Sequence, residues 1–570
     1  MLAGYLPMKA FPTIFYSLAV LLSLHSCNEK RNQADLQREL QSIDLIRGDI
    51  ALCGSGEFQF GTVDFGLSCS EKVRANFNLA TALLHSFEYE EAEKFFTKVI
   101  DEEPDCLMAY WGVAMSNFHP LWAPPTKEEL EKGSQIVAIA RSLDSRESRE
   151  SDYLEAVATV YDNWDSIDHK TRLHKFEAAA ESLFRKYAGD TEAAIFYALA
   201  LKAAADPADK TFTRQRKAGQ ILNDLFTRQP DHPGIAHYII HTFDSPELAE
   251  LGLPAARKYA SIAASSAHAL HMPSHIFVRL GLWDESAQSN INSIEAAKCY
   301  AENQGMSGHW DEELHGLDYL VYAYLQQAQD DKAKEQVDYL ESMQAISPLS
   351  FKTAYSLAAG PTRYALERKD WINAASLDLK PSNFPWEDFP WERSIVSFGK
   401  VLGAVHTKKA ELALEALKEL KDNHAELEKM GKSYEANQVR IQVIASEGWI
   451  ALLQGKKDEA VRLMKAAADM EDATEKHPVT PCEVIPAREL LGDMYMELGQ
   501  FSEARNAYEE DLKGHAGRLN GLYGAGLASQ KLGDLEKARK YFEEAATTAR
   551  LSDMKRKEVL SAKSFLKSKV

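Results

Sequence analysis

Small residues recur at fixed spacings along this chain, and this repetition constrains its fold more than any other feature. Ala504 and Ala538 lie 34 residues apart, and Gly492 precedes Ala504 by 12 residues. The same step of 12 residues separates Ala80 from Ala92 near the amino end. Repeats of 20 to 50 residues are typical of arrays in which each unit buries its apolar face against its neighbours.

The residues around these positions resemble the tetratricopeptide repeat, a pair of antiparallel helices. In that family, small residues let the two helices pack closely, an aromatic side chain fills the gap and a proline closes the unit. The matching positions are Gly492, Ala504, Tyr508, Gly526, Ala538, Phe542 and Ala545 near the carboxyl end, and Ala80, Ala92, Phe96 and Pro104 near the start. The resemblance implies an all-α fold, a right-handed α-solenoid of helix-turn-helix repeats.

The middle of the chain keeps a similar rhythm with longer units. Pro233, Pro273 and Asp311 fit the first turns of helices, because proline and acidic residues favour the amino end of a helix. The segment 384–391 interrupts the pattern, and its prolines predict an extended excursion instead of a helix. The predicted organisation is a signal peptide at 1–27, a tether at 28–45, a Cys/Gly-rich lead-in at 46–72, a histidine-rich array at 73–345, degenerate repeats at 346–470 and terminal repeats at 471–570.

The amino terminus predicts export. Met8 and Lys9 precede an apolar run over 10–24, so the start could lie at Met8. The following Leu24-His25-Ser26-Cys27 resembles a bacterial lipobox, in which Cys27 is acylated. We therefore expect a lipoprotein at the outer membrane, facing the periplasm; a plain secretory signal and an uncleaved anchor are the alternatives.

Charge and cysteines narrow the remaining possibilities. The net charge is −20 and no basic stripe occurs, so we expect no nucleic-acid partner. Cys53 and Cys69 flank a glycine-rich stretch, and in an oxidising compartment they predict a disulfide; two free buried thiols are the alternative. Cys106, Cys299 and Cys482 are expected in the core.

Histidines cluster in one part of the chain. Of the 17 in the sequence, six fall within residues 232–275: His232, His237, His241, His268, His271 and His275. Imidazole is the commonest transition-metal ligand. Because His237 and His241 are four residues apart, they share one face of a helix.

The repeat resemblance predicts where these histidines lie. It places the first helix of each unit along a concave groove, so His237, His241, His275 and His315 should line one wall. His268 precedes Pro273 and is expected in a connector with His271. The candidate metal ligands are His237, His241, His268, His271, His275 and His315, for a divalent transition metal such as zinc or copper. Acidic residues that could complete the shell or orient a ring are Asp231, Asp244, Asp311, Glu312 and Asp318.

Two functions follow from these observations. In the first, which we favour, a membrane-anchored scaffold binds a partner protein or peptide of the envelope in its histidine-lined groove. In the second, the histidine cluster makes the chain a metal-binding protein or a metal-dependent enzyme. The His-Glu-x-x-His motif of metalloproteases is absent, because Tyr238 occupies the position of its glutamate. Packing roles for single histidines are the remaining alternative.

Overall fold

The computed structural model describes residue 1 and residues 33–50, 53, 59–143 and 148–568. The chain divides into two compact units, residues 1–43 and 44–570. The first contains the short helix α1 (Gln33–Gln41). Cys27, Met8 and the expected signal peptide lie outside the described residues. Within the described part, no helix combines the length and the apolarity needed to cross a bilayer.

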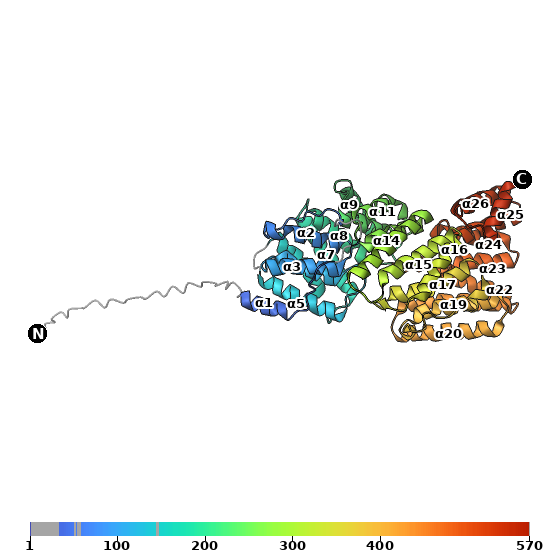
Figure 1. Ribbon diagram of the computed structural model, residues 1–570, viewed down its shortest axis with the longest axis horizontal. Helices are drawn as coiled ribbons and strands as arrows, with labels where there is room; N and C mark the ends of the chain where they lie inside the picture. The colour runs from blue at the N-terminus through green and yellow to red at the C-terminus, as the bar shows by residue number, and fades with distance from the viewer. Residues whose placement is uncertain (2–32, 51–52, 54–58, 144–147, 569–570) are drawn as a thin grey trace. The chain divides into compact units, whose positions relative to one another are not determined.

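The second unit is built almost entirely from helices, as the repeat pattern predicts. Consecutive helices pack against one another as hairpins, for example α14 beside α15 and α19 beside α20 (Figure 1). Its first helices are α2 (Glu71–His85), α3 (Tyr89–Glu102), α4 (Leu107–Phe118), α5 (Lys127–Leu143), α6 (Arg149–Tyr161), α7 (His169–Lys186), α8 (Thr191–Ala203) and α9 (Thr213–Phe226). The fold is therefore an all-α array of helix-turn-helix repeats.

The central helices carry most of the clustered histidines. They are α10 (Pro233–Phe243), α11 (Ala249–Ile262), α12 (Ala267–His271), α13 (Pro273–Arg279), α14 (Trp283–Asn303), α15 (Asp311–Gln326) and α16 (Asp330–Ser342). The predicted helix starts at Pro233, Pro273 and Asp311 are confirmed. A parallel pair of two-residue strands, β1 (His309–Trp310) and β2 (Ile346–Ser347), was not expected from the sequence.

The remaining elements complete the array. They are α17 (Phe351–Glu367), α18 (Trp371–Ala374), the 3-10 helix η1 (Trp386–Asp388), α19 (Pro390–His406), α20 (Ala410–Lys429), α21 (Ser433–Leu453), α22 (Lys457–Asp472), α23 (Ala487–Glu497), α24 (Phe501–Gly514), α25 (Leu519–Lys531), α26 (Leu535–Thr548) and α27 (Lys557–Lys567). The expectation of a wholly extended segment over 384–391 is wrong, because Pro390 begins α19, where a missing backbone N–H costs nothing.

The small residues of the repeats are explained by close aromatic contacts. A Cβ added at Gly492 would lie 2.6 Å from Cε1 of Tyr508, and one at Gly526 would lie 2.7 Å from Cε1 of Phe542. Both distances are far shorter than a van der Waals contact, so only glycine lets these rings fill the space between paired helices. Ala504 and Ala538 are fully buried in the same packing.

The predicted Cys53–Cys69 disulfide is wrong. Cys53 is bonded to Cys299 and Cys69 to Cys106, with Cα–Cα distances of 5.6 Å and 5.4 Å. Proximity in sequence misled the prediction, because the fold brings α14 to residue 53 and the start of α4 to residue 69. The bonds close loops of 246 and 37 residues. In the chain-entropy model they stabilise the fold by about 5 and about 4 kcal/mol. Cys482 is free and buried, as expected.

Candidate metal centre

Four short helices bring the six predicted ligands together as two groups of three. The first triad is His237, His241 and His268, and the second triad is His271, His275 and His315. Within each triad, one ring nitrogen from every histidine lies within 4.8 Å of the others. Helix α12 supplies a member to both triads, because His268 and His271 lie at its two ends.

Local sequence explains the position of α12. Ser266 caps the helix by accepting a hydrogen bond from the backbone N–H of Ala269 at 3.0 Å. Pro273 then starts α13 directly after Met272, which ends α12. The expectation that His268 and His271 lie in an irregular connector is therefore wrong: the chain forms one helical turn, breaks at the proline and restarts.

In the first triad, three Nε2 atoms converge. His237 Nε2 lies 3.1 Å from Nε2 of His268 and 3.1 Å from Nε2 of His241. The Nδ1–H of His237 is already donated to the backbone carbonyl oxygen of His85 at 2.6 Å, so its Nε2 carries only a lone pair. That single lone pair faces two other ring nitrogens, and the buried Nδ1 of His268 has no hydrogen-bond partner.

The second triad is oriented in the same way. His271 and His275 approach each other with their Nε2 atoms 3.1 Å apart. The Nδ1–H of His271 is donated to Oδ1 of Asn290 at 2.7 Å, and that of His275 to the carboxylate of Asp244 at 3.0 Å. The ring of His315 lies 4.1 Å from that of His271 between centroids.

These distances suit a metal ion. With metal–nitrogen bonds of about 2.0–2.1 Å, two ligands on a tetrahedral ion lie about 3.3 Å apart. Histidine ligands in metal sites commonly donate their other ring N–H to a carboxylate or carbonyl, as His237, His271 and His275 do here. Each triad provides three ligands, which leaves at least one coordination position free for a further molecule.

Burial keeps the rings in the form that binds metals. Desolvation lowers the pKa of His237 to about 3 and also lowers the pKa of the other five histidines. All six are therefore neutral near pH 7. His241 is half-buried and the other five are buried, so the histidines that were expected along a groove wall are covered by other side chains. Aromatic rings cover the triads. The ring centroid of Phe87 lies 4.3 Å from that of His237, and the ring centroid of Tyr319 lies 4.6 Å from that of His271.

Phe87 occupies a backbone position that normally favours glycine. Its φ is +61°, in the left-handed region, at the turn that joins α2 to α3. Glycines with positive φ stand after other helices of the array, for example Gly281 and Gly499. A non-glycine residue with this φ destabilises the fold by about 1 kcal/mol. The ring of Phe87 is nevertheless buried against the first triad.

Of the acidic candidates, Asp244 contacts a triad histidine directly, accepting the Nδ1–H of His275 at 3.0 Å. It also binds Arg279 Nε at 2.8 Å and Lys476 Nζ at 3.3 Å. The other candidates pair elsewhere: Asp231 with Lys258, Asp311 and Glu312 with Lys352, and Asp318 with Arg363.

Sequence reasoning missed three residues near the triads. His85 and Glu192 join His232 in a third group, the glutamate network, which is buried. Glu192 accepts hydrogen bonds from Nε2 of His85 at 3.0 Å and of His232 at 2.9 Å. Here the carboxylate binds one nitrogen of each ring, and the buried Nδ1 of His232 has no hydrogen-bond partner. Asn290 was missed as well, because no local motif marks it or His85.

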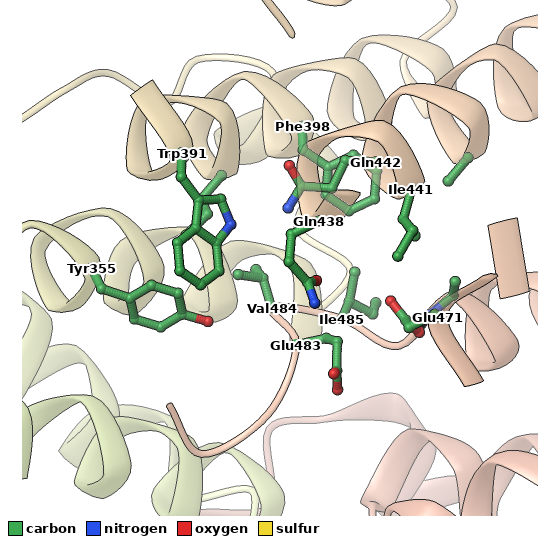
Figure 2. Close-up of a pocket in the computed structure, with 13 residues that line it drawn as sticks. Tyr355, Trp391, Phe398, Gln438, Ile441, Gln442, Glu471, Glu483, Val484 and Ile485 are labelled. Atoms are coloured by element: carbon green, nitrogen blue, oxygen red, sulfur yellow. Dashed lines mark hydrogen bonds between the residues drawn. The ribbon is translucent and has the colours of Figure 1, made fainter. Parts of the chain in front are cut away.

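The pocket of Figure 2 is unrelated to the triads. It lies among Tyr355, Trp391, Gln438 and Glu483 and encloses about 30 Å³. This space holds a water molecule but no organic substrate. A larger hollow of about 630 Å³ borders the glutamate network and is lined by residues that include Asp64, Arg149 and Arg228.

Comparison with known proteins supports the repeat assignment. The Tetratricopeptide repeat model matches residues 73–106, 485–510 and 519–550. No curated protein matches the sequence. The chain is similar to the human IFIT1 dimer with m7Gppp-AAAA at 14% identity, over 82% of this chain and 95% of that one, with a TM-score of 0.33.

A second solved structure shows a likeness of the same kind. It is the APC/C hetero-tetramer Cut9-Hcn1, at 13% identity over 88% of this chain and 96% of that one, with a TM-score of 0.26. Scores this low carry no inference about ligands. The repeat sequences themselves show that this chain carries tetratricopeptide repeats at both ends of its helical array.

Proposed function

We propose that this protein binds two transition-metal ions, one in each histidine triad. The observation that carries the proposal is the convergence of Nε2 atoms at 3.1 Å in both triads, with the opposite ring nitrogens of His237, His271 and His275 held by acceptors. In the second triad both Nδ1–H groups are donated elsewhere, so two Nε2 lone pairs face each other in a buried space, which packing alone does not explain.

The chemistry of the ligands limits which metals fit. Imidazole suits zinc, copper, nickel and iron, and a set of three with a free position is typical of sites that react or bind a further ligand. Magnesium and calcium prefer oxygen ligands and are not expected here. The helical repeats then serve as the scaffold that fixes ligands from α10, α12, α13 and α15.

The test is metal stoichiometry. The protein, made without a histidine tag, is loaded with zinc or copper, passed over a desalting column and measured by elemental analysis. We expect two ions per chain in the wild type and one each in His237→Ala and His271→Ala. The partly exposed His174→Ala is the matched control and should retain both ions.

Folding of each variant is checked by circular dichroism, so that loss of metal is separated from loss of structure. Equal metal content in the wild type and both triad variants, or none in the wild type, would refute the proposal.

A second candidate function, binding of a partner peptide, is favoured by the hollow of about 630 Å³. Its size is within the range of ligand sites, and its lining carries both charges. Helical repeats commonly present such binding surfaces. A partner purified from envelope extracts should lose affinity for Arg228→Ala and keep it for His271→Ala; equal binding by both variants would place the partner elsewhere.

We further propose that the protein is attached to the bacterial outer membrane through a lipid on Cys27, as its lipobox-like sequence suggests. Cys27→Ser should move the protein from the membrane fraction to the soluble fraction. Unchanged membrane association would exclude the lipid anchor.

A further inference from the structure

The two triads are neighbours. The rings of His241 and His275, one from each triad, have centroids 6.4 Å apart, and α12 links the triads through His268 and His271. Two ions held there would belong to one centre, closed off by aromatic side chains. This raises the question of which ions the surroundings tolerate and what binds between them.

Charge decides between the candidate metals. All six ligands are neutral imidazoles, so the triads themselves contribute no negative charge. Four acidic residues near them are already paired with cations: Asp244 with Arg279 and Lys476, Asp311 and Glu312 with Lys352, and Asp318 with Arg363. No carboxylate among these remains to neutralise added charge.

Two divalent ions would place four positive charges in a buried site, at a high desolvation cost. Two Cu(I) ions would bring only two positive charges. Among the metals that imidazole suits, which are zinc, copper, iron and nickel, copper has a common monovalent state. The neutral ligand set therefore favours a pair of copper ions in the reduced state, and an anionic ligand whenever they are oxidised.

We infer that the two triads form a dicopper centre that binds dioxygen between the ions; this inference rests on the metal-binding function proposed above. The step balances without any further reactant. Each Cu(I) gives one electron and becomes Cu(II), and the dioxygen molecule takes both electrons. Its O–O double bond becomes a single bond, each oxygen atom bonds to copper and no proton is needed.

This reaction leaves the net charge of the centre unchanged, because the two charges gained by copper equal the two carried by the reduced dioxygen. The free coordination position of each triad receives one oxygen atom. The aromatic side chains of Phe87, Trp122 and Tyr319 pack against the triads and limit the entry of water: Trp122 lies 5.1 Å from His268 between ring centroids.

The experiment uses the full protein loaded without oxygen with a Cu(I)–acetonitrile solution and then exposed to air. We expect two copper ions per chain, uptake of one dioxygen molecule per two copper ions, and almost no electron paramagnetic resonance signal. Two Cu(II) ions joined by one bridging ligand couple their unpaired electrons and become silent, whereas separate Cu(II) ions give a full signal.

His271→Gln supplies the matched comparison, since it damages the second triad and spares the first. After oxidation with hexacyanoferrate(III), this variant should hold one copper ion with a full signal and take up no dioxygen. His174→Gln should behave as the wild type.

The outcomes separate the two proposals. Two bound copper ions with a full signal in the wild type, or without dioxygen uptake, would overturn the dioxygen inference and leave metal binding intact. Retention of zinc but not copper would overturn the choice of copper. Absence of any bound metal would overturn both.

Discussion

At the scale of single residues, the candidate centre depends on hydrogen bonds that aim the rings as much as on the ligands themselves. Asn290 illustrates this. Its amide nitrogen donates to the backbone carbonyl oxygen of Ser286 at 2.7 Å, which leaves Oδ1 to accept the Nδ1–H of His271 at 2.7 Å. The amide is thereby fixed, and with it the direction of the His271 lone pair.

Replacing Asn290 by leucine keeps the branched shape of the side chain and removes the acceptor. Because second-layer partners of metal ligands are typically worth about 10–100-fold in metal affinity, we expect a loss of that size at the second triad only. Competition titration with a metal-binding dye measures it. Asn292→Leu, on the same helix and bonded to Gln288, is the control. Equal affinities in Asn290→Leu and the wild type would remove Asn290 from the positioning network.

At the scale of elements, the sequence predicts helices well and contacts between distant helices poorly. Gly492, Ala504 and Tyr508 identify a repeat because the packing they require is local. His85 could not be assigned from sequence, because its role comes from the contact between α2 and α10, about 150 residues apart. The disulfide of Cys53 was mispredicted for the same reason.

In the candidate site, too, local features were predictable and contacts between distant helices were not. The six ligands of the triads were identified from spacing and repeat frame, and the structure brings all six together. Their environment was not predictable: a concave surface was expected, but Phe87 and Tyr319 cover the rings. Side chains from non-neighbouring elements decide burial, and no local pattern encodes them.

A link between elements at the carboxyl end gives a prediction about pH. His515, which ends α24, lies 2.9 Å from Oδ1 of Asp511 and 3.0 Å from Oε2 of Glu483 in the connector before α23. Burial alone would lower its pKa, but the two carboxylates outweigh burial and raise the pKa of His515 well above its ordinary value. The same contacts lower the pKa of Glu483 to about 2. The charged pair therefore holds the connector against α24.

Folding thus favours the protonated form of His515. Its contribution to stability is full below about pH 6.5, the ordinary value, and is lost as the pH rises through the raised pKa of the folded protein. We expect His515→Gln to unfold at lower denaturant concentration than the wild type between about pH 5 and 6.5, where His515 and Glu483 are both charged in the folded protein, with the gap closing in alkaline solution. Urea unfolding over a pH series measures this, with His424→Gln as the control, because His424 has a similar exposure and lies farther from its carboxylate, 3.7 Å from Glu428. A gap that is constant with pH would assign the effect to packing.

At the scale of the whole array, most repeats contact their neighbours in sequence, but the carboxyl-terminal repeats also contact α15: Arg518 Nη1 donates to the Tyr322 hydroxyl at 3.0 Å and the backbone N–H of Leu519 to Oε1 of Gln326 at 2.9 Å. A ligand stabilises the repeats it touches and little beyond them. The triads draw on α10, α12, α13 and α15, and the glutamate network joins α2, α8 and α10 beside them. Helix α20, by contrast, packs mainly against α19 and α21 and supplies no member of either triad. Metal binding should therefore slow hydrogen exchange in the helices that carry the triads and leave it unchanged in helices that do not contact them.

Hydrogen exchange followed by mass spectrometry tests this division. At a free metal concentration about 100 times the dissociation constant, binding contributes about 2.7 kcal/mol, which slows exchange through local opening about 100-fold. We expect that protection in α10 and α15, and unchanged exchange in α20, which packs mainly against α19 and α21 and serves as the internal control. The effect should vanish in His237→Ala for α10 and in His271→Ala for α15. Equal protection along the entire array would mean that the solenoid unfolds as one cooperative unit, because stabilisation at the triads would then be transmitted through every interface to the carboxyl end.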